Sequence, residues 1–99
     1  MRIEEIREIK DKLYQIAVKH NISKIFLFGS VVRGENSENS DIDFLLELEP
    51  GASALGIAGF QYEAQELLGI EIDVIPAFAL AKVEDLEFVK NIQAEAVAL

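Results

Sequence analysis

With 99 residues and a formal net charge of −9, this chain has enough length for one hydrophobic core and little for a second. It contains no cysteine, which excludes disulfide bonds and thiolate metal sites. The acidity is uneven, because residues 1–24 carry a net charge of +2 and residues 25–99 carry −11. Such an acidic body would repel a phosphate backbone, so we expect no direct binding to nucleic acid.

The hydrophobicity pattern predicts neither a secretory signal nor a membrane span. The first seven residues mix charges with isolated isoleucines and lack the apolar segment of a signal peptide. The longest stretch of low polarity, residues 51–60, has about half the length of a membrane span. No repeat or linker is visible. We therefore expect a cytoplasmic protein with one domain, residues 1–99.

The first half of the chain predicts a helix, a strand and a loop. Residues 3–19 place aliphatic side chains at helical spacing, with charged residues on the opposite face, which predicts an amphipathic helix. The apolar run 24–28 ends at a glycine and predicts a short buried strand. Residues 34–40 are turn formers and charged residues only, so we expect an exposed loop.

The second half predicts two strands and two helices. Residues 41–48 have an apolar centre and form the second predicted strand. A helix is expected over 54–68, with Gly69 as its C-terminal cap. A third strand covers 71–75 and stops at a proline. A closing helix is expected over 82–97.

The predicted order is α-β-α-β-α-β-α, where the helix between the first two strands is short or only a turn. Three short strands with helices between them predict an α/β or α+β sandwich of two layers. The short link between the first two strands allows an antiparallel pair or a tight crossover. We therefore expect a short mixed β-sheet packed against helices.

Three aspartates are the candidate metal ligands. Asp41 and Asp43 are two residues apart on a predicted strand, so their side chains point to the same face. Asp73 lies within another apolar strand, a costly position for a charge unless it is paired or bound to metal. Carboxylates on neighbouring strands suit Mg²⁺ or Mn²⁺, and their mutual repulsion would raise their pKa values without a cation.

A candidate phosphate site follows the first predicted strand. Gly29 would let the backbone approach a phosphate closely, and the Ser30 hydroxyl could add a hydrogen bond. Arg33 lies on the same turn and could pair with phosphate oxygens. An anion site, metal ions and a carboxylate that assists an attacking hydroxyl are the parts needed for phosphoryl-type transfer.

Two other phosphate or metal motifs are excluded. An EF-hand starting at Asp41 would have Leu46 where glycine is needed and Ala52 where glutamate is needed. No Walker A sequence is present. Each short element is weak by itself, so the prediction depends on their combination and spacing.

That combination resembles the nucleotidyltransferase superfamily of the DNA polymerase β type, and specifically its minimal nucleotidyltransferase (MNT) branch. The Gly-Ser pair is followed by ten residues and an Asp-x-Asp motif, and a third aspartate lies further on. The similarity covers nearly the whole chain, and the segments that carry it are Phe28–Gly34, Ser40–Phe44 and Glu66–Ile75. Val31 departs from the pattern, because a polar or basic residue is more usual there.

The resemblance implies a role for each motif residue. Gly29 and Ser30 would hold the triphosphate of an NTP. Asp41 and Asp43 would bind two metal ions, Mg²⁺ or Mn²⁺. Asp73 would complete one metal site and help to deprotonate the attacking hydroxyl.

The MNT branch is commonly paired with a HEPN-domain ribonuclease toxin. The resemblance therefore implies an antitoxin that transfers AMP from ATP to a tyrosine of this partner, in a hetero-oligomer. A bulky anion beside an RNA-binding or catalytic site would block it. An open site on a 99-residue core also suits an acceptor that another protein presents.

Two alternatives remain open from the sequence. A small-molecule nucleotidyltransferase of the aminoglycoside-modifying type would share this core, but it normally needs a further helical domain. A binding antitoxin that acts by occlusion would need no intact set of aspartates. All three aspartates are present, which favours an active enzyme.

Overall fold

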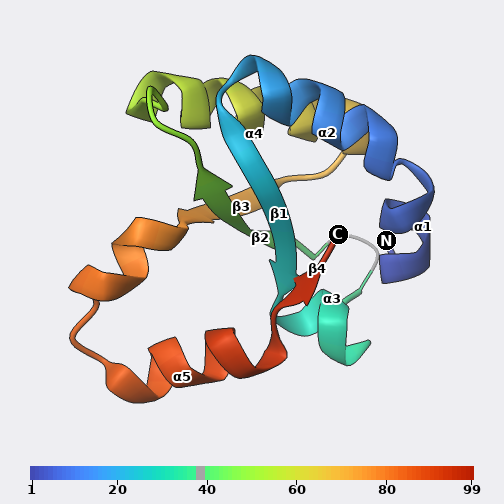
Figure 1. The fold of residues 1–99 in the computed structure, drawn as a ribbon. Coiled ribbons are helices and arrows are strands. Elements are labelled where there is room, and N and C mark those ends of the chain that lie inside the picture. Colours follow the sequence, from blue (N-terminus) through green and yellow to red (C-terminus); the bar gives the residue numbers. More distant parts are fainter. Residues whose placement is uncertain (38–39) are drawn as a thin grey trace.

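The structure, a computed structural model, describes residues 1–37 and 40–99 (Figure 1). Glu38 and Asn39, which belong to the loop expected over 34–40, lie outside the described residues. The elements in chain order are α1 (Ile3–Glu8), α2 (Lys10–Lys19), β1 (Ile22–Phe28), α3 (Ser30–Arg33), β2 (Ile42–Leu48), α4 (Ala54–Leu68), β3 (Ile72–Pro76), the 3₁₀ helix η1 (Ala77–Lys82), α5 (Leu86–Glu95) and β4 (Val97–Ala98).

The strands form a mixed sheet in the order β3-β2-β1-β4. β1 pairs antiparallel with both β2 and β4, whereas β2 and β3 are parallel. The parallel pair is joined through α4, as a crossover connection requires. The predicted α+β class and the predicted mixed sheet are confirmed.

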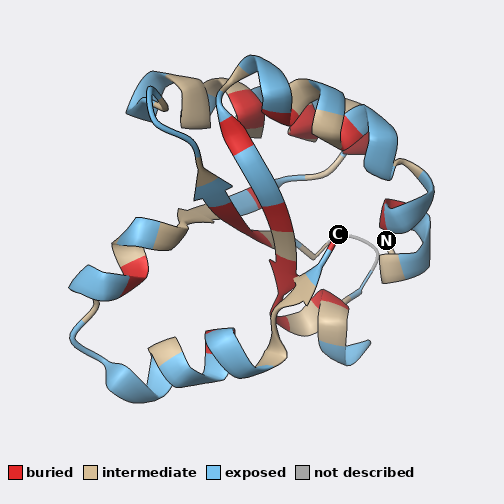
Figure 2. Cartoon of the chain, viewed as in Figure 1, coloured by how far each residue is buried: buried red, intermediate tan, exposed pale blue. Residues whose placement is uncertain are grey.

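The two faces of the sheet carry different layers. Side chains alternate along each strand, so β2 turns Phe44 and Leu46 to one face and Leu45 to the other. The first face packs against α1, α2 and α4 and forms the main core. The second face packs against η1 and α5 around a smaller cluster that includes Phe28 and Ile92. Figure 2 shows buried residues along β1 and β2 and on the inner side of α2.

The first predicted helix, 3–19, is broken in the structure. Ile9 has φ −108° and ψ 18°, outside the helical range, and separates α1 from α2. Figure 1 shows α1 turned away from the axis of α2. The turn allows both Ile6 and Leu13 to be fully buried in the main core. Tertiary packing therefore overrides a local pattern that is helical throughout.

The closing helix predicted over 82–97 is wrong at both ends. Residues 77–82 form η1, and α5 begins only after Asp85, whose side chain accepts a hydrogen bond of 3.1 Å from the Phe88 N–H. Val97 and Ala98 form β4 beside β1, and the Leu99 N–H donates to the Ile25 carbonyl at 2.9 Å. This pairing completes the sheet edge and fixes the end of α5.

None of the helices within residues 1–37 and 40–99 combines the length and the apolar character needed to cross a membrane.

Candidate active site

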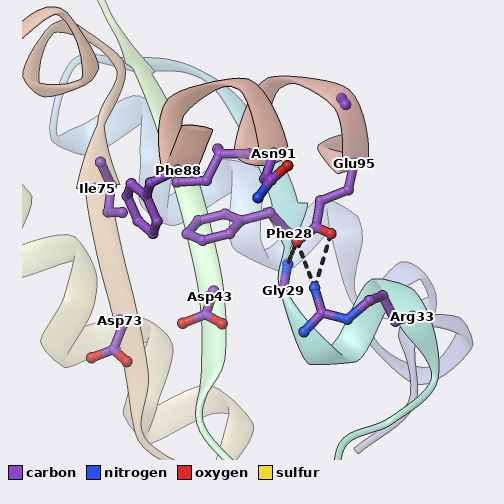
Figure 3. A pocket seen from close by; sticks show the side chains of 11 residues that line it. Phe28, Gly29, Arg33, Asp43, Asp73, Ile75, Phe88, Asn91 and Glu95 are labelled. Carbon is purple, nitrogen blue, oxygen red and sulfur yellow. Dashed lines mark hydrogen bonds and ion pairs between the residues drawn. The ribbon is translucent and has the colours of Figure 1, made fainter. Parts of the chain in front are cut away.

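Two of the predicted aspartates lie side by side on the face of the sheet that carries α5. Asp43 of β2 and Asp73 of β3 are direct partners in the parallel pairing. Their neighbours Phe44 and Ile72 point to the opposite face and are buried in the main core. Figure 3 shows the two carboxylates next to each other at one end of a cleft. The strand positions predicted for these two acids therefore place their carboxylates next to each other.

Asp73 is more accessible than its sequence context indicates. The apolar residues around it predicted a charge inside the core, but Asp73 is exposed. The reason is the strand alternation, since only Ile72 points into the core and Asp73 points away from it. The expectation of a buried Asp73 is wrong, and the cost of burying its charge does not arise.

Asp41 directly precedes the first residue of β2 and is exposed. It is close enough to Asp43 for its charge to raise the pKa of the Asp43 carboxyl. Within the described parts of the chain, no three His, Asp or Glu side chains lie close enough to hold a metal ion in their present positions. A metal site built from all three aspartates therefore stays a prediction.

Asp43 is the most perturbed titratable group of the site. Burial, followed by repulsion from Asp73 and Asp41, raises the pKa of Asp43 to about 6. The Arg33 guanidinium acts in the opposite direction. A half-buried carboxylate with two like charges beside it needs a compensating cation, and oxygen ligands of this kind suit a hard divalent ion. The chemistry of these residues thus fits Mg²⁺ or Mn²⁺.

Gly29 directly follows β1 and lies against this carboxylate. Its φ of 78° and ψ of −152° lie in a region that is essentially reserved for glycine. A Cβ at this position would also collide with the Asp43 Oδ2 atom. The Gly29 carbonyl accepts hydrogen bonds from the Val32 and Arg33 N–H groups at 3.1 and 3.3 Å, which starts α3. Ser30 is the first residue of that helix and is partly exposed.

A glutamate that the sequence did not reveal contacts the predicted phosphate site. The Gly29 N–H donates to Glu95 Oε1 at 2.7 Å, and Arg33 Nη1 donates to both Glu95 oxygens at 2.9 Å (Figure 3). Arg33 also donates through Nε to Glu35 at 3.2 Å. These contacts, first with Glu95 and then with Glu35, raise the pKa of Arg33. We call the Gly29 N–H and the Arg33 guanidinium together the anion grip.

The anion grip and the carboxylate pair line the same cleft, of about 730 Å³. Helix α5 adds Phe88, Asn91 and Glu95 to its wall, and the side chains of Phe88 and Asn91 extend toward it in Figure 3. Ser30 and Asp41 are not among the residues that line it. The α5 residues lie far from the motif in the sequence, and no local pattern distinguishes them from other helix residues.

A comparison with protein families decides the classification of this chain. The family model described as nucleotidyltransferase domain matches residues 3–99. The chain belongs to this nucleotidyltransferase family. The predicted enzyme class, a nucleotidyltransferase, is therefore confirmed.

Relatives from two organisms support the same family. A Methanocaldococcus jannaschii protein with the provisional name protein adenylyltransferase MJ0435 is 44% identical over 70 residues, which cover 71% of this chain and 75% of the relative. The protein adenylyltransferase MntA of Thermococcus cleftensis is 33% identical over 61 residues, which cover 62% of each chain.

Solved structures support the fold. A structure provisionally described as a minimal nucleotidyltransferase has a TM-score of 0.80 and 27% identity, and covers 100% of this chain and 97% of that chain. One chain from a crystal structure of a toxin–antitoxin with AMP-PNP has a TM-score of 0.68 and 16% identity, and covers 90% of this chain and 70% of that chain. At this lower identity the likeness is one of fold alone.

Proposed function

We propose that this protein transfers AMP from ATP to a tyrosine hydroxyl of a HEPN-domain ribonuclease toxin and thereby acts as its antitoxin. The observation that carries the proposal is the position of the Asp43–Asp73 pair beside the anion grip in one cleft. Relatives named protein adenylyltransferases and a chain of similar fold in a toxin–antitoxin structure support this choice of acceptor.

The donor is held by residues at the end of β1 and on α3. The Gly29 N–H is a backbone donor and the Arg33 guanidinium is a charged donor, and both suit phosphate oxygens. The Ser30 hydroxyl, one residue after Gly29, adds a further hydrogen bond to the triphosphate. These groups fix the phosphates so that the α-phosphorus lies near the aspartates.

Asp41, Asp43 and Asp73 would hold two Mg²⁺ ions, or Mn²⁺ in their place. When bound, such ions neutralise phosphate charge and polarise the phosphorus that is attacked. Asp73, the exposed member of the pair, accepts the proton of the tyrosine hydroxyl. The tyrosyl oxygen then forms a bond to the α-phosphorus, the bond to the bridging oxygen breaks, and pyrophosphate leaves.

The apolar part of the cleft accommodates the nucleoside. Phe28, Ile75 and Phe88 form one wall, and Phe88 is 43% exposed, so its ring offers a surface to an aromatic base. The Asn91 amide, with two donors and one acceptor oxygen, lies on the same side (Figure 3).

The exposed carboxylates Asp41 and Asp73 face the solvent from which an acceptor would approach. The net charge of −9 favours a basic partner, and a ribonuclease that binds RNA is expected to present such a surface. Use of ATP and of a ribonuclease partner agrees with a cytoplasmic location.

Transfer of label from [α-³²P]ATP to the purified toxin tests this function. We expect the wild-type protein to label the toxin in the presence of Mg²⁺, and Asp43→Asn to abolish labelling. Glu47→Gln is the matched control, because Glu47 is another acid on β2 that does not line the cleft. Neutralisation of the toxin by Asp43→Asn without any label would instead support occlusion, and absence of label with the wild-type protein would exclude the proposal.

A further inference from the structure

The anion grip already holds an anion, and this anion is a side chain of the protein. Glu95 Oε1 accepts from the Gly29 N–H at 2.7 Å, and both Glu95 oxygens accept from Arg33 Nη1 at 2.9 Å. A carboxylate thus takes the place of phosphate oxygens on a backbone N–H and a guanidinium, which bind both kinds of group.

The backbone on both sides of Glu95 fixes its position. Glu95 is the last residue of α5, and two residues later the chain enters β4, where Val97 pairs with Leu27 and Ala98 with Phe26. The Glu95 side chain is 24% exposed, so water only partly screens its interaction with Arg33. The path of the chain from α5 into β4 therefore places the Glu95 carboxylate against the anion grip.

The Glu95 carboxylate and a phosphate cannot use the grip together. The Gly29 N–H has one hydrogen, and a second acceptor at the same place would meet the like charge of Glu95. We propose that Glu95 is an internal competitor for the nucleotide, which occupies the anion grip in the free protein and is displaced when the triphosphate binds. This inference rests on the proposed use of the grip for a triphosphate.

Displacement is possible without unfolding of the site. Glu95 lies at the end of a helix on the rim of the cleft, so a change of its side-chain rotamer is enough to release the grip. Arg33 then keeps its second partner, Glu35, at 3.2 Å. The apparent Kd equals the intrinsic Kd divided by the fraction of molecules in which the grip is free. A grip that is free in about one molecule in ten therefore raises the apparent Kd about tenfold.

Calorimetric titration of the full chain with α,β-methylene-ATP and Mg²⁺ tests the competitor. This analogue is not cleaved between the α- and β-phosphates, so the measurement reports binding alone. We expect Glu95→Gln to lower the Kd about tenfold, because the amide has the shape of the carboxylate without its charge. Glu35→Gln is the control: it removes the other acid on Arg33 but leaves the Gly29 N–H contact intact, and we expect less than a twofold change.

Each result has a defined meaning. A higher Kd for Glu95→Gln would overturn the inference, because it would mean that Glu95 positions Arg33 for nucleotide binding. An unchanged Kd, or an equal gain for Glu35→Gln, would also overturn it. If neither the wild-type protein nor any variant binds the analogue, the proposed function itself fails. Glu95→Ala, with a thermal melt of each variant, provides the same comparison if Glu95→Gln does not fold.

Discussion

One face of the sheet carries the main hydrophobic core, and the other face carries the candidate active site. On the face toward α1, α2 and α4, large side chains such as Phe44 and Phe60 are fully buried. The centroids of these two rings lie 6.1 Å apart. On the face toward α5, the smaller cluster keeps a few per cent exposure and borders an open, charged cleft. Asp43 and Phe44 are adjacent in β2 yet serve opposite faces. The alternation of one strand thus lets a single segment support the core and build the site.

The largest effect on stability is expected on the main-core face. Phe44→Ala removes a ring that is 0% exposed and leaves a cavity, so we expect a loss of about 3–5 kcal/mol in the free energy of unfolding. Urea denaturation followed by circular dichroism measures this loss. A loss below about 1 kcal/mol, as is typical of surface positions, would show that the two faces do not differ as described.

Gly29 lies between β1 and α3 and lines the cleft, so its replacement tests the site side of this comparison. Gly29→Ala places a Cβ against Asp43 and strains the backbone, whereas Gly69→Ala, at φ 73°, meets nothing within 4 Å. We expect Gly69→Ala to cost about 1–2 kcal/mol from backbone strain alone. Gly29→Ala should cost more and should also weaken nucleotide binding. Equal losses in urea denaturation would mean that the contact with Asp43 has no effect.

Asp43→Asn is expected to stabilise the metal-free protein, although the same substitution should abolish labelling of the toxin. The raised pKa of Asp43, about 6, means that its charge opposes folding, so the stability present below about pH 4 is lost as pH rises through 6. The variant keeps that stability. Thermal melts should therefore agree near pH 4 and diverge by pH 7, with the variant higher. A wild-type protein that melts higher at pH 7 would contradict this sign.

The smallest effect on stability is expected at the rim of the cleft. Phe88→Ala removes a side chain that is 43% exposed, so we expect a loss within about 1 kcal/mol. The same substitution should raise the Kd for α,β-methylene-ATP severalfold, because a base would lose its aromatic contact. Inorganic triphosphate, which has no base, is the control ligand and should bind both proteins equally.

Elements with local signals could be predicted from the sequence. α4 has the predicted bounds, Ala54–Leu68, because both of its ends are encoded nearby: the Ser53 hydroxyl accepts from the Gly56 N–H at 3.0 Å, and Gly69 adopts the left-handed conformation. β1 was expected at 24–28 and begins two residues earlier. The position of Asp43 likewise follows from its own strand, whereas Asp41, expected on the same strand, lies one residue before β2.

Features that depend on distant contacts could not be predicted. The break at Ile9 arises from burial of Ile6 and Leu13 in the same core, and β4 exists only because β1 offers an edge. Glu95 contacts Gly29 because α5 packs on the second face of the sheet and ends beside β1, and the sequence neighbours of Glu95 carry no sign of this contact. Four of the eleven residues that line the cleft, Gly29, Arg33, Asp43 and Asp73, were therefore predicted from the sequence, whereas α5 supplies five.

Helix α5 supplies the part of the cleft that the strands and the β1–α3 turn do not, mainly from one of its faces. Phe88, Asn91 and Glu95 follow each other at intervals of three and four residues along α5, and all line the cleft. The helix has its own N-terminal cap at Asp85 and a strand at its other end. Under the proposed function, two side chains that would contact the nucleoside, Phe88 and Asn91, therefore lie on the same short helix as Glu95, the proposed competitor for its phosphates.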